Sequence, residues 1–161
     1  MIVVSNTSPL TNLAAIGQFD LLRQLYSEVQ IAVGVWNELG ARGRRWPGHD
    51  EVANADWIKQ LVVRDQNLIT VLLRDLDRGE SETLALASEI GAGLVLLDER
   101  DGRRVAQRLG LRTIGVLGVL LEAKKRGLLS SIRPQLDALR HDAGFYVSDG
   151  VYRSVIDLAE E

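Results

Sequence analysis

Hydrophobic and polar residues follow one another along the chain in blocks that predict strands separated by helices. Short aliphatic runs predict strands at residues 2–5, 28–31, 94–97 and 112–114. Apolar residues recur at helical spacing, and this predicts two short helices within 9–26 and others at 32–39, 81–90, 101–109, 116–126, 132–141 and 148–158. Such alternation favours an α/β fold, a three-layer α/β/α sandwich around a central, mostly parallel sheet.

Three segments lack such a clear pattern. Residues 41–50, ARGRRWPGHD, are rich in Gly, Arg and Pro, so we expect a loop there. Residues 57–63 and 68–73 are apolar but short, and they suit a strand and a buried helix equally well.

The composition is typical of one domain with a substantial core. The chain has 161 residues, of which 46% are hydrophobic, so it can bury a core without outside support. It contains no cysteine, which excludes disulfides, thiolate zinc sites and cysteine nucleophiles and fits a cytoplasmic location. The apolar runs are shorter than the roughly 20 residues that a membrane helix needs. The start of the chain resembles a strand and not a signal peptide.

The charge balance gives no overall attraction to nucleic acid. The formal net charge is -3 and the pI is near 5.5, so any nucleic-acid binding must be local. Basic residues do gather in the predicted loop, at Arg42, Arg44 and Arg45, and around the helix at 101–109. We take Arg44, Arg45, Arg100 and Arg103 as candidate nucleic-acid contacts, and a solvated surface is the alternative for each group.

Polar residues follow the predicted strands and border the predicted helices. Asn6 follows the first strand, Asp98 follows the aliphatic strand, and Asp101 comes three residues later. Glu80 begins one helix and Glu38 lies near the end of another. We expect these side chains to converge at the carboxyl edge of the sheet. Carboxylates that lie close together repel one another, and a bound cation relieves this repulsion. Oxygen ligands favour Mg²⁺ or Mn²⁺. Taken alone, Glu38, Glu80 and Asp101 have a helix cap or a surface group as the alternative. Asp98 is the strongest candidate, because a lone acid that ends an aliphatic strand is costly without a partner.

Four segments of the chain carry a family resemblance. They are VVSNTSPLTNLAAIGQFDLLRQL, VWNELG, DRGESETLALASEIGAGLVLLDERDGRRVAQRLGLRTIGVLGVLLEAKKRGLL and FYVSDGVYRSVIDL. In this order they resemble the DUF3368 group of PIN-domain proteins. The resemblance implies one PIN-like, Rossmann-like domain over residues 1–161, with the C-terminal helices at about 131–159 packing as a cover. It also implies a magnesium-dependent ribonuclease fold related to the toxins of prokaryotic toxin–antitoxin pairs, with an RNA substrate, an antitoxin protein and a second copy of the chain as partners.

The resemblance assigns site residues one by one. The first family acid falls on Asn6, the second on Glu38, the third on Glu80, and the fourth on Asp98 with Asp101 beside it. The catalytic set is then these five residues, of which Asn6, Glu80 and Asp98 would bind metal.

One position in this set has a competitor. Glu82 competes with Glu80, and two residues turn a helix by about 200°, so only one of the two can face the metal. We favour Glu80 because it lies at the mouth of the helix.

Asn6 departs from the family pattern, because an amide replaces the expected carboxylate. An amide oxygen still coordinates Mg²⁺, but without the negative charge, so metal affinity should fall. Thr7 and Ser8 could orient the first ligand or a bound water, or simply form the turn into the helix.

Two hypotheses of different classes follow. The leading one is a metal-dependent endoribonuclease in which a water held by the ion attacks the phosphate. The alternative is a catalytically silent PIN-like module that binds RNA or protein. A nucleotide-binding Rossmann-like domain is less favoured, because no GxGxxG or GxxxxGK motif follows the first strand.

Overall fold

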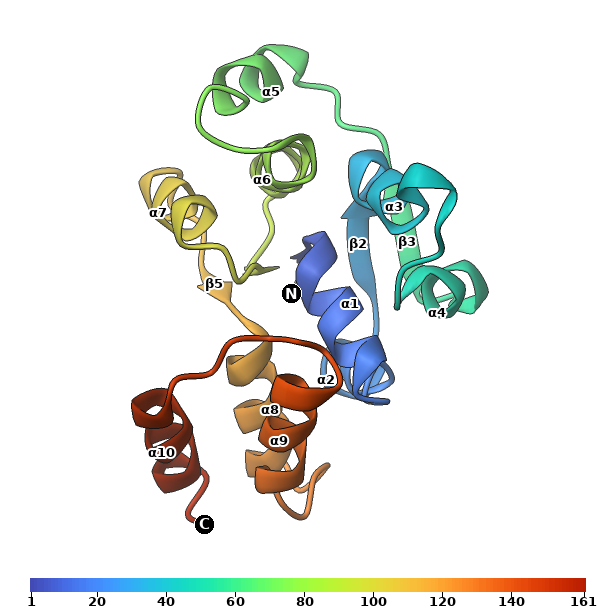
Figure 1. Ribbon diagram of the computed structural model, residues 1–161. Helices are drawn as coiled ribbons and strands as arrows, with labels where there is room; N and C mark the ends of the chain where they lie inside the picture. The colour runs from blue at the N-terminus through green and yellow to red at the C-terminus, as the bar shows by residue number, and fades with distance from the viewer.

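A parallel sheet forms the centre of the molecule. The computed structural model describes residues 1–161 except the side chain of Arg42, so the basic group at Arg42 lies outside the described side chains. The strands are β1 Val3–Ser5, β2 Val29–Ala32, β3 Ile58–Leu61, β4 Leu94–Leu96 and β5 Thr113–Ile114. They form one sheet in the order β3-β2-β1-β4-β5, with every neighbouring pair parallel (Figure 1). This confirms the predicted α/β class with a central, mostly parallel sheet.

Helices connect the strands and follow the last one. They are α1 Thr7–Ala15, α2 Leu21–Tyr26, α3 Val33–Leu39, α4 His49–Asn54, α5 Gln66–Leu72, α6 Arg78–Ile90, α7 Arg100–Arg108, α8 Val116–Lys125, α9 Arg133–His141 and α10 Asp149–Leu158, with a short 3-10 helix, η1, at Ala41–Gly43. In the described part of the chain, no helix is long and apolar enough to span a membrane.

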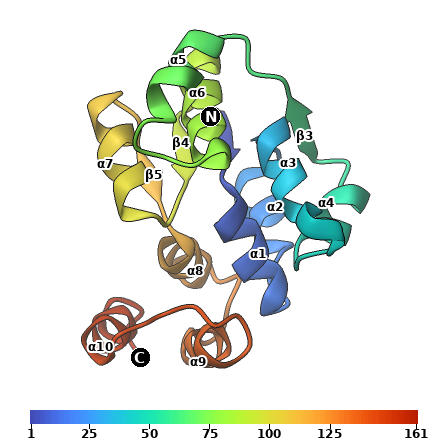
Figure 2. The ribbon, with the colours of Figure 1, turned by 45° about the horizontal axis from the view of Figure 1, so that its top comes forward.

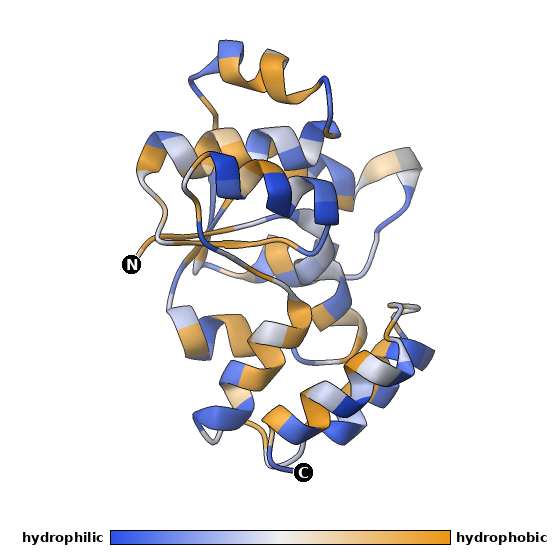
Figure 3. Ribbon diagram, turned by 90° about the vertical axis from the view of Figure 1, so that its left-hand side faces the viewer, coloured by the Kyte–Doolittle hydropathy of each residue, from blue (hydrophilic) through white to orange (hydrophobic). Residues whose placement is uncertain are grey.

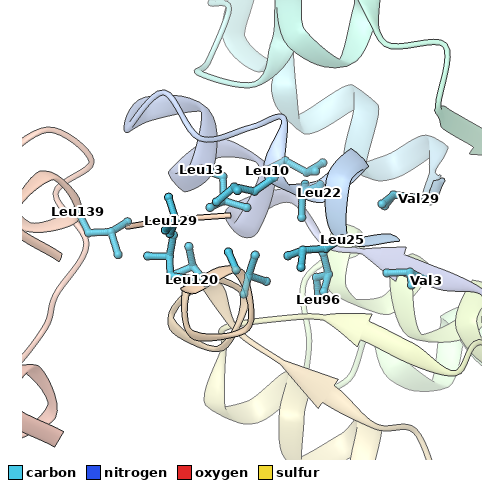
Figure 4. Close-up of a cluster of buried hydrophobic side chains, with 14 of the residues drawn as sticks. Val3, Leu10, Leu13, Leu22, Leu25, Val29, Leu96, Leu120, Leu129 and Leu139 are labelled. Atoms are coloured by element: carbon cyan, nitrogen blue, oxygen red, sulfur yellow. The ribbon is translucent and has the colours of Figure 1, made fainter. Parts of the chain in front are cut away.

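The sheet separates two hydrophobic cores. Val3 packs on one face of β1 and Val4 on the other, because successive side chains of a strand point in opposite directions. The first core lies against α1, α2 and α8, which contribute Leu10, Leu22 and Leu120 (Figure 4). The second core lies against α5, α6 and α7 (Figure 2). Apolar and polar segments alternate along the helices (Figure 3), as amphipathic helices over a sheet require.

The C-terminal helices extend the first core. Leu136 and Leu139 of α9 and Ile156 of α10 are buried with it. Glu161 ties the segment after α10 to the segment before α9. Its carboxylate accepts hydrogen bonds from the Ser131 hydroxyl at 2.6 Å and the Ile132 backbone N–H at 2.5 Å. These bonds, together with a nearby lysine, lower the pKa of Glu161 to about 2.

The structure assigns the two segments whose type the pattern left open. Residues 58–61 form strand β3, which pairs with β2 at the sheet edge. Residues 66–72 form helix α5, whose first turn is capped by Asp65, since the Asp65 carboxylate accepts from the Leu68 N–H at 3.0 Å.

The predicted loop at 41–50 is shorter than expected. It contains the short helix η1, and α4 already begins at His49. Gly48, with a φ of 98°, makes the sharp turn into α4 that a residue with a side chain would strain. The Glu51 carboxylate accepts from the Gly48 N–H at 2.8 Å and so ends the loop early.

The strand order creates a topological switch between β1 and β4. From β1 the chain proceeds outward through β2 to β3, and it then crosses back to β4 on the other side of β1. The Asn6 backbone N–H donates to the Leu96 carbonyl at 2.9 Å, so the carboxyl ends of β1 and β4 lie side by side. Open parallel sheets bind their ligands at such a switch point.

Candidate active site

A cavity of about 480 Å³ opens at the switch point. Its lining comes from the tips of β1 and β4, the first half of α1, the end of α3 and the start of α6. The lining residues are Asn6, Thr7, Ser8, Thr11, Asn12, Glu38, Ala41, Trp46, Asp77, Glu80 and Glu99. Four of these described residues carry carboxylates and none carries a positive charge. The cavity is therefore suited to a cation.

Strand β1 delivers the first polar groups into the cavity. Asn6 is buried, and its amide oxygen accepts a long hydrogen bond of 3.4 Å from the Thr83 hydroxyl. Thr7 donates its hydroxyl hydrogen to the Glu38 carboxylate. The Ser8 hydroxyl oxygen is buried and has no hydrogen-bond partner among the described residues. An unsatisfied buried hydroxyl in a cavity wall is available to a bound ligand.

Glu38 is held in place from two helices. Besides Thr7 at the start of α1, the Gly79 backbone N–H in the first turn of α6 donates to Glu38 Oε1 at 3.1 Å. A side chain at position 79 would overlap this carboxylate, so glycine allows the close approach. Burial, followed by the charges of Asp77 and Glu82, raises the pKa of Glu38, although the two hydrogen bonds oppose this shift.

Glu80 is the carboxylate of the cavity whose pKa is raised to about 7. It lies in the first turn of α6, which is capped by Asp77, because the Asp77 carboxylate accepts from the Glu80 N–H at 2.8 Å. Burial raises the pKa of Glu80 to about 7, with further contributions from the charges of Asp77, Glu99 and Glu38. Crowded carboxylates of this kind are relieved when a cation binds between them.

The structure separates Glu80 from its competitor Glu82. Glu82 points to the neighbouring helix, where the Gly34 N–H at the start of α3 donates to Glu82 Oε1 at 3.1 Å. Arg78 approaches the same carboxylate at 3.6 Å. Glu80 lines the cavity and Glu82 binds α3, so the preference for Glu80 agrees with the geometry.

Asp98 and Asp101 do not line the cavity. Asp98 turns toward the start of α8, where Oδ1 accepts from the Val116 N–H at 3.0 Å. Burial raises the pKa of Asp98, whereas the bond from Val116 and the charge of Arg103 lower it. Its other oxygen, Oδ2, is buried without a partner among the described residues. Asp101 is exposed in the first turn of α7, which begins at Arg100, so it is not the cap of this helix.

Residues that the sequence pattern did not single out complete the cavity. Glu99 lines it in place of Asp98, and Asp77 adds a carboxylate from the cap of α6. Thr11 and Asn12 of α1 add uncharged polar groups. Asp77 had a signal in the sequence, since it precedes a helix by one residue, but the acid pair 98–99 contained no local sign of which side chain faces the cavity.

The predicted nucleic-acid contacts differ in their surroundings. The Arg44 guanidinium lies over the Trp46 ring, 4.2 Å from its centroid, and Trp46 lines the cavity. Arg45 is exposed and approaches Asp50 at 3.6 Å. Arg100 is exposed at the start of α7. Arg103 donates from Nε to the Leu97 carbonyl at 2.8 Å, which ties it to the end of β4. Arg44 is thus the arginine linked to the cavity through Trp46.

Comparison with known proteins identifies the family. The family model described as DUF3368, PIN domain, matches residues 2–161. The chain belongs to this PIN-domain family. PIN-domain proteins are in general nucleases, and they typically use divalent metals. No curated protein and no solved structure matches the chain.

The residues of this PIN domain fit a divalent cation in kind and in charge. The ligands that the cavity offers are oxygen atoms, which Mg²⁺ and Mn²⁺ prefer, and burial together with the charges of Asp77, Glu99 and Glu38 raises the pKa of Glu80. Among the described residues, however, no three Asp, Glu, His or Cys side chains are placed to hold one ion together. The Asn6 amide and oxygens of a bound phosphate would complete such a set.

Proposed function

We propose that this PIN domain is a divalent-metal-dependent endoribonuclease that hydrolyses phosphodiester bonds. The observation that supports it best is the gathering of Asn6, Glu38 and Glu80 around one cavity at the switch point of the sheet. Family membership supports the nuclease class, and the oxygen ligands support Mg²⁺ or Mn²⁺ as the cofactor.

The proposed mechanism gives each side chain of the cavity one role. Asn6 and Glu80 would hold the cation, which when bound neutralises charge on the phosphate and helps to activate water. Glu38 is kept in one orientation by Thr7 and Gly79, and its raised pKa suits it to take a proton from the attacking water. The free Ser8 hydroxyl would donate to a phosphate oxygen. Water would attack the phosphorus and the P–O3′ bond would break, which leaves a 5′-phosphate on one fragment and a 3′-hydroxyl, protonated from solvent, on the other, as the family resemblance suggests.

The biological setting belongs to the same proposal. A role as the toxin of a toxin–antitoxin pair, with an antitoxin partner and a homodimeric state, is supported by the family resemblance alone. The RNA substrate is supported in addition by the cavity and its aromatic neighbour Trp46.

Cleavage of single-stranded RNA in Mn²⁺ tests the proposal. Glu80→Gln should lower the cleavage rate by about 100-fold or more, because an amide without negative charge replaces the carboxylate and holds the cation more weakly. Glu82→Gln is the matched control on the same helix, and it should cleave within a few-fold of the parent. Equal rates for the parent and Glu80→Gln would refute the assignment.

A silent RNA- or protein-binding module is the second candidate, and two observations favour it. Asn6 stands where the family pattern has an acid, and no three acids among the described residues are placed to share one ion. Asn6→Asp separates the two functions. If the parent is inactive and this variant gains Mn²⁺ binding and cleavage, the present chain is a silent module. If both cleave RNA, the endoribonuclease is the correct function.

A further inference from the structure

Trp46 is anchored through its backbone at the edge of the cavity. Its backbone N–H donates to the Leu39 carbonyl at 3.0 Å, and its carbonyl accepts from the His49 N–H at 2.9 Å. These bonds connect the end of α3 to the start of α4 through Trp46. The ring is half-buried and lines the cavity, while the Arg44 guanidinium lies 4.2 Å from the ring centroid. The Arg44 guanidinium therefore covers one face of the Trp46 ring, and a flat ligand would stack on the opposite face.

The second turn of α1 forms another wall of the same cavity. Thr11 and Asn12 line it, and no hydrogen bond from either side chain occurs among the described residues. The Asn12 carboxamide thus has both a donor and an acceptor to offer a ligand. Since α1 rises about 1.5 Å per residue, Asn12 lies about 9 Å along the helix axis from Asn6. The cavity consequently has an acidic end, around Asn6, and an uncharged end, formed by Thr11 and Asn12.

This division matches the two parts of a nucleotide. At about 480 Å³, the cavity falls in the range of small-ligand sites. Carboxylates at one end suit a cation and its phosphate, but they offer nothing to a flat heterocycle. An aromatic ring beside an arginine suits the face of a base, and a carboxamide suits its edge. A base inside a duplex is stacked between its neighbours, so its faces are not available to Trp46.

We propose that Trp46 and Asn12 form a subsite for an unpaired nucleobase of single-stranded RNA, next to the acidic end of the cavity. In this subsite Trp46 stacks on the base, Asn12 hydrogen-bonds to the base edge, and Arg44 places a positive charge near the strand. The inference rests on the proposed endoribonuclease function and assigns the residues that would receive a base of its RNA substrate.

Binding measured without metal tests the subsite separately from the chemistry. Stacking needs no ion, so fluorescence anisotropy of labelled oligoadenylate is measured in EDTA, with its oligouridylate duplex as the comparison. Trp46→Ala should weaken binding of the single strand by about tenfold or more, as loss of one stacked base does. Trp46→Phe keeps an aromatic face and should stay within a few-fold of the parent. Trp57→Phe is the control, since Trp57 packs against Phe19 with ring centroids 5.2 Å apart.

The outcomes separate the subsite from the nuclease. Equal binding of oligoadenylate by the parent and Trp46→Ala, or equal binding of single strand and duplex by the parent, overturns the subsite. Loss of cleavage in Glu80→Gln would still support the nuclease in either case. A parent that neither binds oligoadenylate in EDTA nor cleaves it in Mn²⁺ overturns both. Circular dichroism of Trp46→Ala shows that any lost binding is not lost folding.

Discussion

Removing the negative charge of Glu80 should stabilise the protein while it disables the site. Burial, and to a lesser extent the charges of Asp77, Glu99 and Glu38, raises the pKa of Glu80 from its ordinary 4.5 to about 7. The folded chain therefore binds this proton more tightly than the unfolded chain does. The stability that this proton provides is fully present below pH 4.5 and is lost as the pH rises through 7. Glu80→Gln, which carries no charge, should escape this loss.

The size of the effect follows from the pKa. A change from 4.5 to about 7 corresponds to about 3 kcal/mol. The carboxylate opens onto the cavity, where solvent screens its neighbours, so we expect about 1 to 2 kcal/mol for the gain in the free energy of unfolding at pH 8. Urea unfolding in EDTA at pH 5 and pH 8 measures it. A variant that is no more stable than the parent at pH 8, or that gains equally at both pH values, would refute the reasoning.

Two controls sharpen this experiment. Glu82→Gln removes the same charge two residues away, but Glu82 accepts from the Gly34 N–H and lies near Arg78. It should therefore lose about 0.5 to 1 kcal/mol of unfolding free energy at both pH values. Adding Mn²⁺ should reverse the order of the parent and Glu80→Gln, because an ion that binds only the folded parent stabilises it by mass action.

Four further substitutions test other parts of the structure. Gly79→Ala should displace the Glu38 carboxylate and weaken Mn²⁺ binding about tenfold in calorimetry; unchanged affinity would count against a role for Glu38. Asp98→Ala should cost about 1 to 2 kcal/mol in urea unfolding, because the start of α8 loses its acceptor, whereas Glu99→Gln should keep its stability and weaken Mn²⁺ binding. Glu161→Gln should melt below the parent at pH 6, and the difference should shrink as the pH falls from 4.5 toward 2; a gap that widens in acid would contradict the assigned pKa.

The elements that could be predicted are those whose pattern is local and strong. The run at 94–97 gave a buried strand because every residue in it is aliphatic, and both faces of β4 are indeed covered. The segment at 58–61 was ambiguous because β3 lies at the sheet edge, with Lys59 and Gln60 exposed. Its strand conformation depends on pairing with β2, and no local pattern records that contact.

The candidate site likewise contains residues that a local pattern predicts and residues that depend on distant contacts. Asn6 was predictable because it ends a strand, and Glu80 because it opens a helix, so the fold alone brings both toward the switch point. The choice between Asp98 and Glu99 was not predictable. Asp98 turns away because its carboxylate accepts a hydrogen bond from the N–H of Val116, 18 residues later in the chain. Glu99 lines the cavity instead. This arrangement depends on the contact between Asp98 and Val116, which are distant in the sequence.

Calorimetric titration with Mn²⁺ tests most directly whether the cavity is a metal site. The purified parent is titrated beside Glu80→Gln and Glu82→Gln, and no knowledge of the RNA target is needed. The account predicts saturable binding in the parent and in Glu82→Gln, and binding that is weaker by an order of magnitude or more in Glu80→Gln. No saturable heat in the parent, or equal affinity in the parent and Glu80→Gln, would contradict it.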